Sequence, residues 1–269
     1  MIPGLLMVLA ATRVSGSWGL LECFGNVAGC LAYFGLAIYA FCLCNQVVGI
    51  EEDRLNKPDR VIPSGLLETR GALERLALAL VAFPLVAMLL GGQGLTRWAL
   101  AWELVFLFYN LFGLDRHWFT KNVVFIGLGV LVLLAAAWEI VAPLDALAWR
   151  WIIVIAVIFG ATLNLQDFRD VDGDRAMSRG TLPVTMGQDR SRWIVAISIA
   201  CTPIIVHVFL FAPAQWSVLT QSIEIGLTAL NLLVAYRTVR RRGPAADHTT
   251  YMLHTYWYCA VIGAGIFVM

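Results

Sequence analysis

Two acidic runs at the ends of apolar segments hold the side chains best suited to do chemistry. The first, 45–53, reads Asn-Gln-Val-Val-Gly-Ile-Glu-Glu-Asp, and the second, 167–174, reads Asp-Phe-Arg-Asp-Val-Asp-Gly-Asp. Carboxylates at bilayer depth are costly and require a partner. Because the two runs lie far apart in the chain and each is followed by basic residues, they predict a shared site for Mg²⁺ and a polyanion such as diphosphate.

Helical spacing gives the first run one polar face. Residues three, four or seven apart lie on the same side of an α-helix. Asn45, Gly49, Glu52 and Asp53 are therefore expected to share a face, whereas Glu51 points elsewhere. A face that carries an amide and two carboxylates is suited to meeting a cation.

The same spacing groups Asp167, Asp170 and Asp174 on one face of the second run, with Asp172 directed elsewhere. Neighbouring carboxylates repel one another when no cation lies between them. Mg²⁺ commonly binds one or two carboxylates together with waters and phosphate oxygens, so the three aspartates are predicted to be metal ligands and catalytic residues. The competing interpretation, that both runs are solvated helix ends, is weakened by their matching position and spacing.

The composition indicates an integral membrane protein. Of the 269 residues, 60% are hydrophobic and 14% are charged, and the mean hydropathy is +0.77. Soluble domains carry about 25% charged residues. The net charge of +1 gives no reason to expect nucleic acid, and no obligate protein partner is inferred. Residues 1–269 are expected to form a single all-α transmembrane domain.

Apolar segments of helical length predict a polytopic protein with about nine membrane spans. The first span is the weakest, because Arg13, Ser15 and Ser17 interrupt it. The second and sixth spans end in the two acidic runs. The expected spans are 2–20, 26–50, 72–92, 95–114, 120–141, 148–168, 191–211, 215–237 and 251–269.

The basic residues predict how the chain is oriented. All of the 19 lysines and arginines except Arg13, Arg97 and Arg150 fall in the loops after the second, fourth, sixth and eighth spans, or in the helical turns beside them. Cytoplasmic loops are enriched in such residues. Both acidic runs, and with them the mouth of the predicted site, are therefore expected to face the cytoplasm, as is the N-terminus.

Two motifs support a family resemblance. The first run can be written Asn45-Gln46-x-x-Gly49-x-x-x-Asp53, and the second Asp167-x-x-Asp170-x-x-Gly173-Asp174-Arg175, followed by Thr-Leu-Pro-Val at 181–184. They resemble the paired motifs of the UbiA superfamily of intramembrane prenyltransferases, whose first motif is Asn-Asp-x-x-Asp-x-x-x-Asp. The second motif matches closely. In the first, Gln46 and Gly49 stand where the family has aspartates.

The resemblance implies nine helices around a central cavity, with Mg²⁺ and a prenyl diphosphate at the two motifs. Asn45 and Asp53 then join the second-run aspartates as catalytic residues and metal ligands, and Glu52 is expected to replace the ligand missing at Gly49. The basic residues beside the runs, together with a lysine and a tyrosine between helices four and five, are expected to bind substrate; they are Lys57, Arg60, Arg175, Lys121 and Tyr109.

The altered first motif resembles the terpene-cyclase branch of this superfamily, and aromatic side chains able to stabilise a carbocation are abundant. The expected reaction is therefore ionisation of an allylic prenyl diphosphate, with C15 the expected chain, followed by cyclisation to a sesquiterpene. One alternative is transfer of the prenyl group to an aromatic or other lipophilic acceptor. A second is an ion-coupled transporter, because such proteins also hold intramembrane acids.

Overall fold

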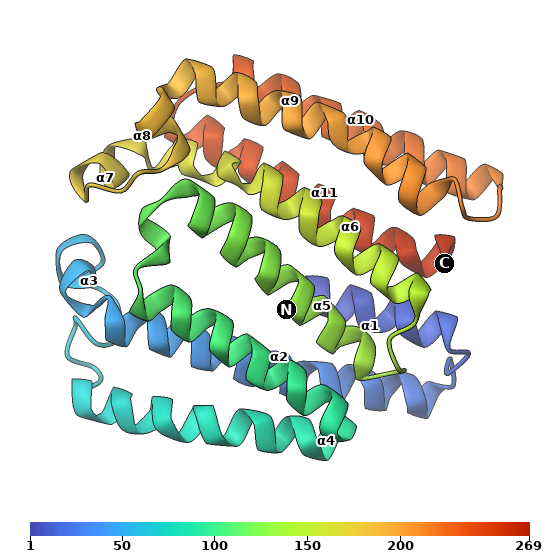
Figure 1. The fold of residues 1–269 in the computed structure, drawn as a ribbon, viewed down its shortest axis with the longest axis horizontal. Coiled ribbons are helices and arrows are strands. Elements are labelled where there is room, and N and C mark those ends of the chain that lie inside the picture. Colours follow the sequence, from blue (N-terminus) through green and yellow to red (C-terminus); the bar gives the residue numbers. More distant parts are fainter.

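The computed structural model describes the backbone of residues 1–269 and every side chain except those of Leu55 and Asn56. All the elements formed by the described residues are helices, arranged as one bundle (Figure 1). Seven helical segments are long and apolar enough to cross a membrane. They are α2 (Leu20–Val48), α4 (Thr69–Leu111), η2 with α5 (Phe119–Ile126, Gly127–Glu139), α6 with η3 (Ala146–Thr162, Leu163–Arg169), α9 with η4 (Gln188–Val206, His207–Phe211), α10 (Val218–Arg240) and α11 (Pro244–Val268).

The expected number of nine spans is not confirmed. The predicted spans 72–92 and 95–114 correspond to two helices, both within α4, that meet at a kink where Gly91 and Gly92 leave helical geometry. Gly92 has a φ of +64°, a conformation that glycine adopts without steric cost. The first element, α1 (Ile2–Val14), has 13 residues. It is therefore about 20 Å long, less than the roughly 30 Å hydrocarbon core of a bilayer.

Short elements gather at one end of the bundle. They are α3 (Ile50–Asn56), η1 (Leu114–Arg116), α7 (Val171–Ala176) and α8 (Leu182–Met186). The two acidic runs lie in α3 and α7 and in the segments leading to them, so both runs are at this same end (Figure 1). Met1, by contrast, lies partway along the bundle, beside Phe34 of α2.

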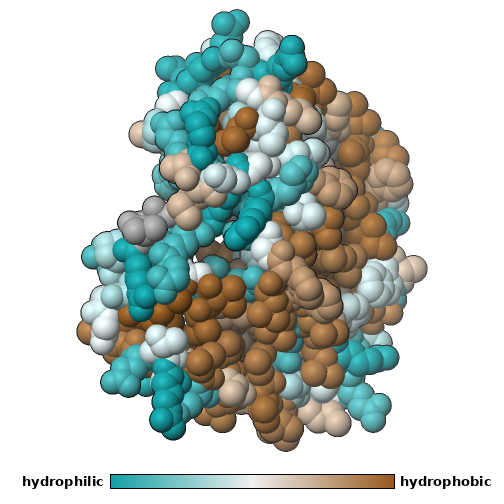
Figure 2. Space-filling model, turned by 60° about the vertical axis from the view of Figure 1, so that its left-hand side comes forward, coloured by the Kyte–Doolittle hydropathy of each residue, from teal (hydrophilic) through white to brown (hydrophobic). Residues whose placement is uncertain are grey.

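The outer surface of the bundle is suited to lipid. Large apolar side chains such as Leu78, Leu89 and Ile225 are exposed on the long helices. From the end that carries the short elements, hydrophilic residues surround a hollow, while the adjoining helix surface is hydrophobic (Figure 2). Exposed apolar helix faces next to a polar end are the pattern expected of a protein that spans a bilayer.

Small residues let the inner helices approach one another. A Cβ atom on Gly160 of α6 would lie 3.1 Å from the carbonyl oxygen of Val123 and 3.2 Å from the Cα of Gly127. A larger residue at this position would force the two backbones apart by a few tenths of an ångström. Around these contacts, α1, α2, α4, α5, α6 and α11 enclose a central cavity, as expected from the family resemblance.

Candidate active site at one end of the bundle

A polar pocket of about 280 Å³ opens at the end of the bundle that holds the acidic runs. Its walls come from the end of α2, from α3, from the end of α4, from η1 and η2, and from the loop after α7. The polar and charged residues lining it are Asn45, Glu52, Asp53, Lys57, Arg60, Tyr109, Asn110, Asp115, Arg116, Lys121 and Arg179.

The first acidic run presents its polar face to this pocket, as predicted. The chain is no longer an α-helix at Gly49 (φ −91°, ψ 18°), where α2 ends and α3 begins. The helical hydrogen bonds nevertheless continue across the break, because the Gly49 amide donates to Asn45 and the Asp53 amide donates to Gly49, both at 2.9 Å. The side-chain directions are therefore kept, and Asn45, Glu52 and Asp53 all line the pocket.

Basic residues neutralise these carboxylates. Arg60 donates to Asp53 Oδ2 at 2.5 Å, and the Asp53 side chain is only 5% exposed. Lys57 lies in the same wall. Lys57 and Arg60 are thus placed as predicted, where they can meet an anionic ligand.

The second acidic run departs from the prediction. Residues 163–169 form a 3₁₀-helix, and Asp170 has non-helical torsions (φ −116°, ψ 16°) before α7 begins. The α-helical rule that residues three, four or seven apart share a face therefore does not apply across this run. The Asp170 carboxylate is 60% exposed, accepts a hydrogen bond from Arg169 at 2.9 Å, and lies outside the polar pocket. The expectation that it shares a face with Asp167 and Asp174 was wrong.

Asp167 and Asp174 are instead buried behind the pocket wall, with exposed fractions of 1% and 5%. Lys121, which lines the pocket, donates to Asp167 Oδ1 at 2.7 Å. Asn122 donates to Asp167 Oδ2 at 2.8 Å and to the side-chain oxygen of Asn164 at 2.9 Å. Lys121 thus connects η2 to the second acidic run. The role of Asn122 was not predicted.

Arg179 links the two runs, and no feature of the sequence singled it out. Its Nη2 atom donates to both carboxylate oxygens of Glu52, at 2.7 and 2.9 Å, and to Asp115 Oδ2 at 3.1 Å. Its Nη1 atom lies 3.7 Å from Asp174 Oδ1. The predicted Arg175 instead contacts Asp172 at 3.4 Å and is 62% exposed, away from the pocket.

The loop carrying Arg179 is held by main-chain hydrogen bonds. The Gly180 amide donates to the carbonyl of Arg116 at 2.6 Å, and the Trp118 amide donates to the carbonyl of Gly180 at 3.0 Å. Burial opposes the charge on Arg179, but the carboxylates of Glu52, Asp115 and Asp174 outweigh it and raise the pKa of the guanidinium. A loop-to-loop contact of this kind has no periodic signature. The nearest signal was its place two residues before the Thr-Leu-Pro-Val segment.

The donor set fits a magnesium ion. Within the residues that the structure describes, no three acidic, histidine or cysteine side chains are already gathered around one point. Each carboxylate instead faces a cationic side chain. One buried oxygen, Asp174 Oδ2, has no hydrogen-bond partner among the described residues. Amide and carboxylate oxygens are the hard ligands that Mg²⁺ prefers, so Asn45, Glu52, Asp53 and Asp174 are suited to such an ion.

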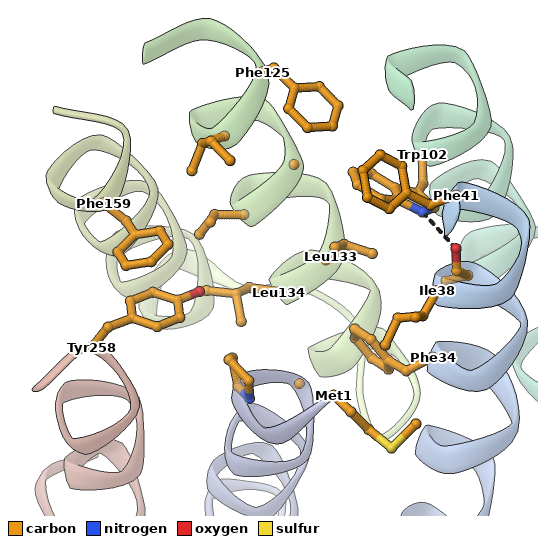
Figure 3. A pocket seen from close by; sticks show the side chains of 16 residues that line it. Met1, Phe34, Ile38, Phe41, Trp102, Phe125, Leu133, Leu134, Phe159 and Tyr258 are labelled. Atoms are coloured by element: carbon orange, nitrogen blue, oxygen red, sulfur yellow. Dashed lines mark hydrogen bonds between the residues drawn. The ribbon is translucent and has the colours of Figure 1, made fainter. Parts of the chain in front are cut away.

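An apolar cavity of about 280 Å³ lies deeper in the bundle. Six aromatic side chains from five helical segments project into it (Figure 3); they are Phe34, Phe41, Trp102, Phe125, Phe159 and Tyr258. Tyr109, which lines the polar pocket, stacks on Phe125 with ring centroids 3.7 Å apart. This pair forms the wall between the polar pocket and the apolar cavity.

Similarity to known proteins agrees with this arrangement. Somaliensene A/B synthase of Streptomyces somaliensis is 41% identical over all of this chain and 88% of the relative. Diterpene cyclase eriG of Hericium erinaceus is 33% identical over 97% of this chain and 81% of the relative. A solved structure of a UbiA homolog from Archaeoglobus fulgidus, bound to DMAPP and Mg²⁺, shares the fold with a TM-score of 0.67 at 17% identity, covering 99% of this chain and 97% of the other. The sequence model of the UbiA prenyltransferase family matches residues 1–259, and the chain belongs to that family.

Proposed function

We propose that this protein is a Mg²⁺-dependent intramembrane terpene cyclase that acts on an allylic prenyl diphosphate. The observation that carries the proposal is the contact of Tyr109 with Phe125, across which a pocket of cationic and oxygen-bearing side chains meets an aromatic cavity. A prenyl diphosphate has the same two parts, a polyanionic head and an apolar tail. The relatives named as a terpene synthase and a diterpene cyclase support this choice.

The diphosphate head is bound by the basic residues of the polar pocket. Cationic groups come from three separate segments: Lys57 and Arg60 from the loop after α3, Lys121 from η2, and Arg179 from the loop after α7. Mg²⁺, which the similar Archaeoglobus fulgidus structure holds, supplies further charge stabilisation of the leaving diphosphate. The ligands proposed for it are Asn45, Glu52, Asp53, Asp167 and Asp174. Asp170 is left out, because its carboxylate is exposed and paired with Arg169, whereas Asp167 and Asp174 are buried beside the pocket.

Ionisation breaks the bond between the allylic carbon and the diphosphate oxygen, and both electrons leave with the oxygen. Cationic groups already fixed in the pocket stabilise the charge that develops there. The carbocation left behind lies on the side of Tyr109 and Phe125, at the entrance to the apolar cavity. Aromatic faces stabilise a desolvated cation by about 2 kcal/mol, and the apolar walls exclude the water that would quench it.

Ring closure follows when a double bond farther along the tail donates its electron pair to the allylic cation. A new carbon–carbon bond forms and the positive charge moves to the distal carbon. The sequence led to a C15 substrate and a sesquiterpene product, and we retain that proposal. A diterpene contains 20 carbons, so the name of the fungal relative makes C20 the first competing chain length.

The alternative function is prenyl transfer to an aromatic or other lipophilic acceptor. The family name favours it, and the hollow at the polar end offers a route for an acceptor (Figure 2). The two functions share the ionisation step and differ in which nucleophile reaches the allylic carbon. Both are enzymatic, and family membership argues against the ion-coupled transporter.

The test is incubation of the purified protein in lipid nanodiscs with Mg²⁺ and C10, C15 and C20 prenyl diphosphates, without an acceptor. Diphosphate release and hydrocarbon products are measured together. Cyclic hydrocarbons are expected, and C15 is expected to turn over fastest. Release that requires an added aromatic acceptor would support the transferase instead. Full turnover in excess EDTA would refute the role of a metal, and no release under any of these conditions would refute both functions.

We further propose that the polar pocket opens at the cytoplasmic face. The support is the distribution of basic residues, because loops at this end carry Lys57, Arg60 and Arg116. A cysteine placed at the exposed position of Asp172 should react with a membrane-impermeant maleimide only after the membrane is opened. Labelling of intact cells would reverse the orientation.

A further inference from the structure

Among the described side chains that line the apolar cavity, only Tyr258 carries an oxygen, and the ionisation step does not use this hydroxyl. We infer that this hydroxyl fixes where the positive charge rests after ring closure, and so determines which product is released. The inference rests on the proposed cyclase function. The inference concerns the carbocation formed after ring closure, whereas the residues of the polar pocket act in the ionisation that starts the reaction.

Tyr258 stands out because the rest of the cavity lining is apolar. Of the described residues that line the cavity, it alone has a side-chain oxygen. The indole nitrogen of Trp102 also reaches this region, but it donates to the carbonyl of Ala37 at 3.3 Å. The Tyr258 hydroxyl forms no hydrogen bond with another described residue, and it points into the cavity toward Leu134 (Figure 3). Its lone pairs therefore face whatever fills the cavity.

The ring is held in this orientation by a stack of aromatic side chains. Tyr258 packs on Phe159 with centroids 3.9 Å apart and planes 22° apart. His254, one turn earlier in α11, stacks on the same Phe159 at 5.8 Å and is fixed by a 2.9 Å contact with the hydroxyl of Thr162. A tyrosine held by packing presents its oxygen at a defined point, as positioning of a reactive intermediate requires.

The position of Tyr258 suits the distal end of a prenyl chain. The allylic carbon lies near Tyr109 and Phe125, where the polar pocket ends. Tyr258, on α11, lies across the cavity from Phe125 (Figure 3), so a prenyl tail that fills the cavity would extend between them. When ring closure transfers the charge along the tail, the phenol oxygen is the one side-chain oxygen in the described lining, and its lone pairs attract that charge. In an apolar cavity such an attraction is much stronger than in water.

No bond to Tyr258 is required for this role. The oxygen stabilises one carbocation relative to its rearranged isomers. The carbocation that persists longest then loses a proton from a carbon next to its charged centre to the released diphosphate, and the C–H electron pair becomes the new double bond. Removing the oxygen while keeping the ring should therefore change the proportions of products. It should not abolish the release of diphosphate, which is driven from the polar pocket.

The experiment compares Tyr258→Phe with Tyr256→Phe. Both residues lie on α11, and each substitution removes one phenol oxygen. The Tyr256 side chain, however, is exposed on the outside of the bundle. Each protein is incubated with Mg²⁺ and the best prenyl diphosphate, and products are resolved by gas chromatography and mass spectrometry. The ratio of major to minor cyclic products should change at least about threefold in Tyr258→Phe, and not in Tyr256→Phe.

The outcomes separate this inference from the proposed function. If the wild-type protein forms cyclic products and Tyr258→Phe forms them in the same ratio, the role of Tyr258 is refuted and the cyclase function stands. If the wild-type protein forms no cyclic product with any chain length, both are refuted. A matching thermal unfolding profile for the two variants shows that a changed ratio does not come from a loosened bundle.

Discussion

The first acidic run keeps its polar side chains on the pocket across a break in its helix, whereas the second turns one of them away. At Gly49 the hydrogen bonds of α2 continue into α3, so Glu52 and Asp53 follow Asn45. Between Asp167 and Asp174 the backbone passes through a 3₁₀-helix and a non-helical residue. Equal spacing in the sequence thus yields a shared face only where the helical hydrogen bonds are continuous.

The two runs also differ in how their charge is balanced. Asp53 in the first run is paired with a nearby residue, Arg60, seven positions along the chain. Asp167 in the second run is reached from a distant segment, by Lys121 of η2, whereas Asp174 lies near Arg179, five positions along the chain. Arg179 also binds Glu52, so it joins the two runs into one site. Four substitution pairs test this comparison.

The largest difference is expected within the second run, between Asp174→Asn and Asp170→Asn. Asp174 is buried with one unpartnered oxygen, whereas Asp170 is exposed and bonded to Arg169. Loss of a preorganised charge at a reacting centre costs on the order of a hundredfold in turnover, so this loss is expected for Asp174→Asn. Asp170→Asn should stay within about threefold of wild type. The rate of diphosphate release measures both, and equal losses would show that Asp170 turns inward when substrate binds.

Arg179→Gln and Arg175→Gln form the second pair, because they remove the same charge four residues apart. Arg179 contacts three carboxylates in the pocket wall, and Arg175 contacts only Asp172 on the surface. We expect Arg179→Gln to lower turnover by on the order of thirtyfold and to lower the Mg²⁺ concentration needed for half-maximal rate, since carboxylates that have lost the guanidinium attract a cation more strongly. Arg175→Gln should leave the Mg²⁺ dependence unchanged. Identical magnesium titrations for the two variants would contradict the linking role of Arg179.

These contrasts show what could be predicted from the sequence. Apolar segments and helix-end carboxylates are local features, so the bundle, the end that holds the site and the face of the first run were all predictable. The 3₁₀-helix at 163–169 was not, because its residues do not differ in type from those of an α-helix. Arg179 was not either, since its contacts join segments 64 and 127 residues apart in the chain.

The third pair, Glu52→Gln and Glu51→Gln, tests the first run alone. Glu52 lines the pocket, whereas Glu51 is largely exposed and paired with Arg54 at 2.7 Å. If Glu52 replaces the ligand absent at Gly49, its loss should cost about tenfold in turnover and should raise the Mg²⁺ concentration needed for half-maximal rate. The loss for Glu51→Gln should be within about twofold, as for surface ion pairs. In the double variant Glu52→Gln with Arg179→Gln the losses should be less than additive, because the two side chains share one interaction.

The smallest change in rate, and the most specific in outcome, is expected for Gly49→Asp. A Cβ atom at position 49 would lie 3.0 Å from the carbonyl oxygen of Asn45, so the junction of α2 and α3 must shift by a few tenths of an ångström. The new carboxylate restores the aspartate that the family motif has at this position, and ionisation should persist within about threefold of the wild-type rate. The added side chain occupies space in the pocket wall where a prenyl chain would coil next to the leaving group. We therefore expect a larger share of linear alcohols among the products, measured beside Gly49→Ala, which adds the Cβ without the charge.

If Gly49→Ala shifts the products as far as Gly49→Asp, space at the helix junction is the cause. An unchanged profile in both would mean that the departure at Gly49 has no part in cyclisation.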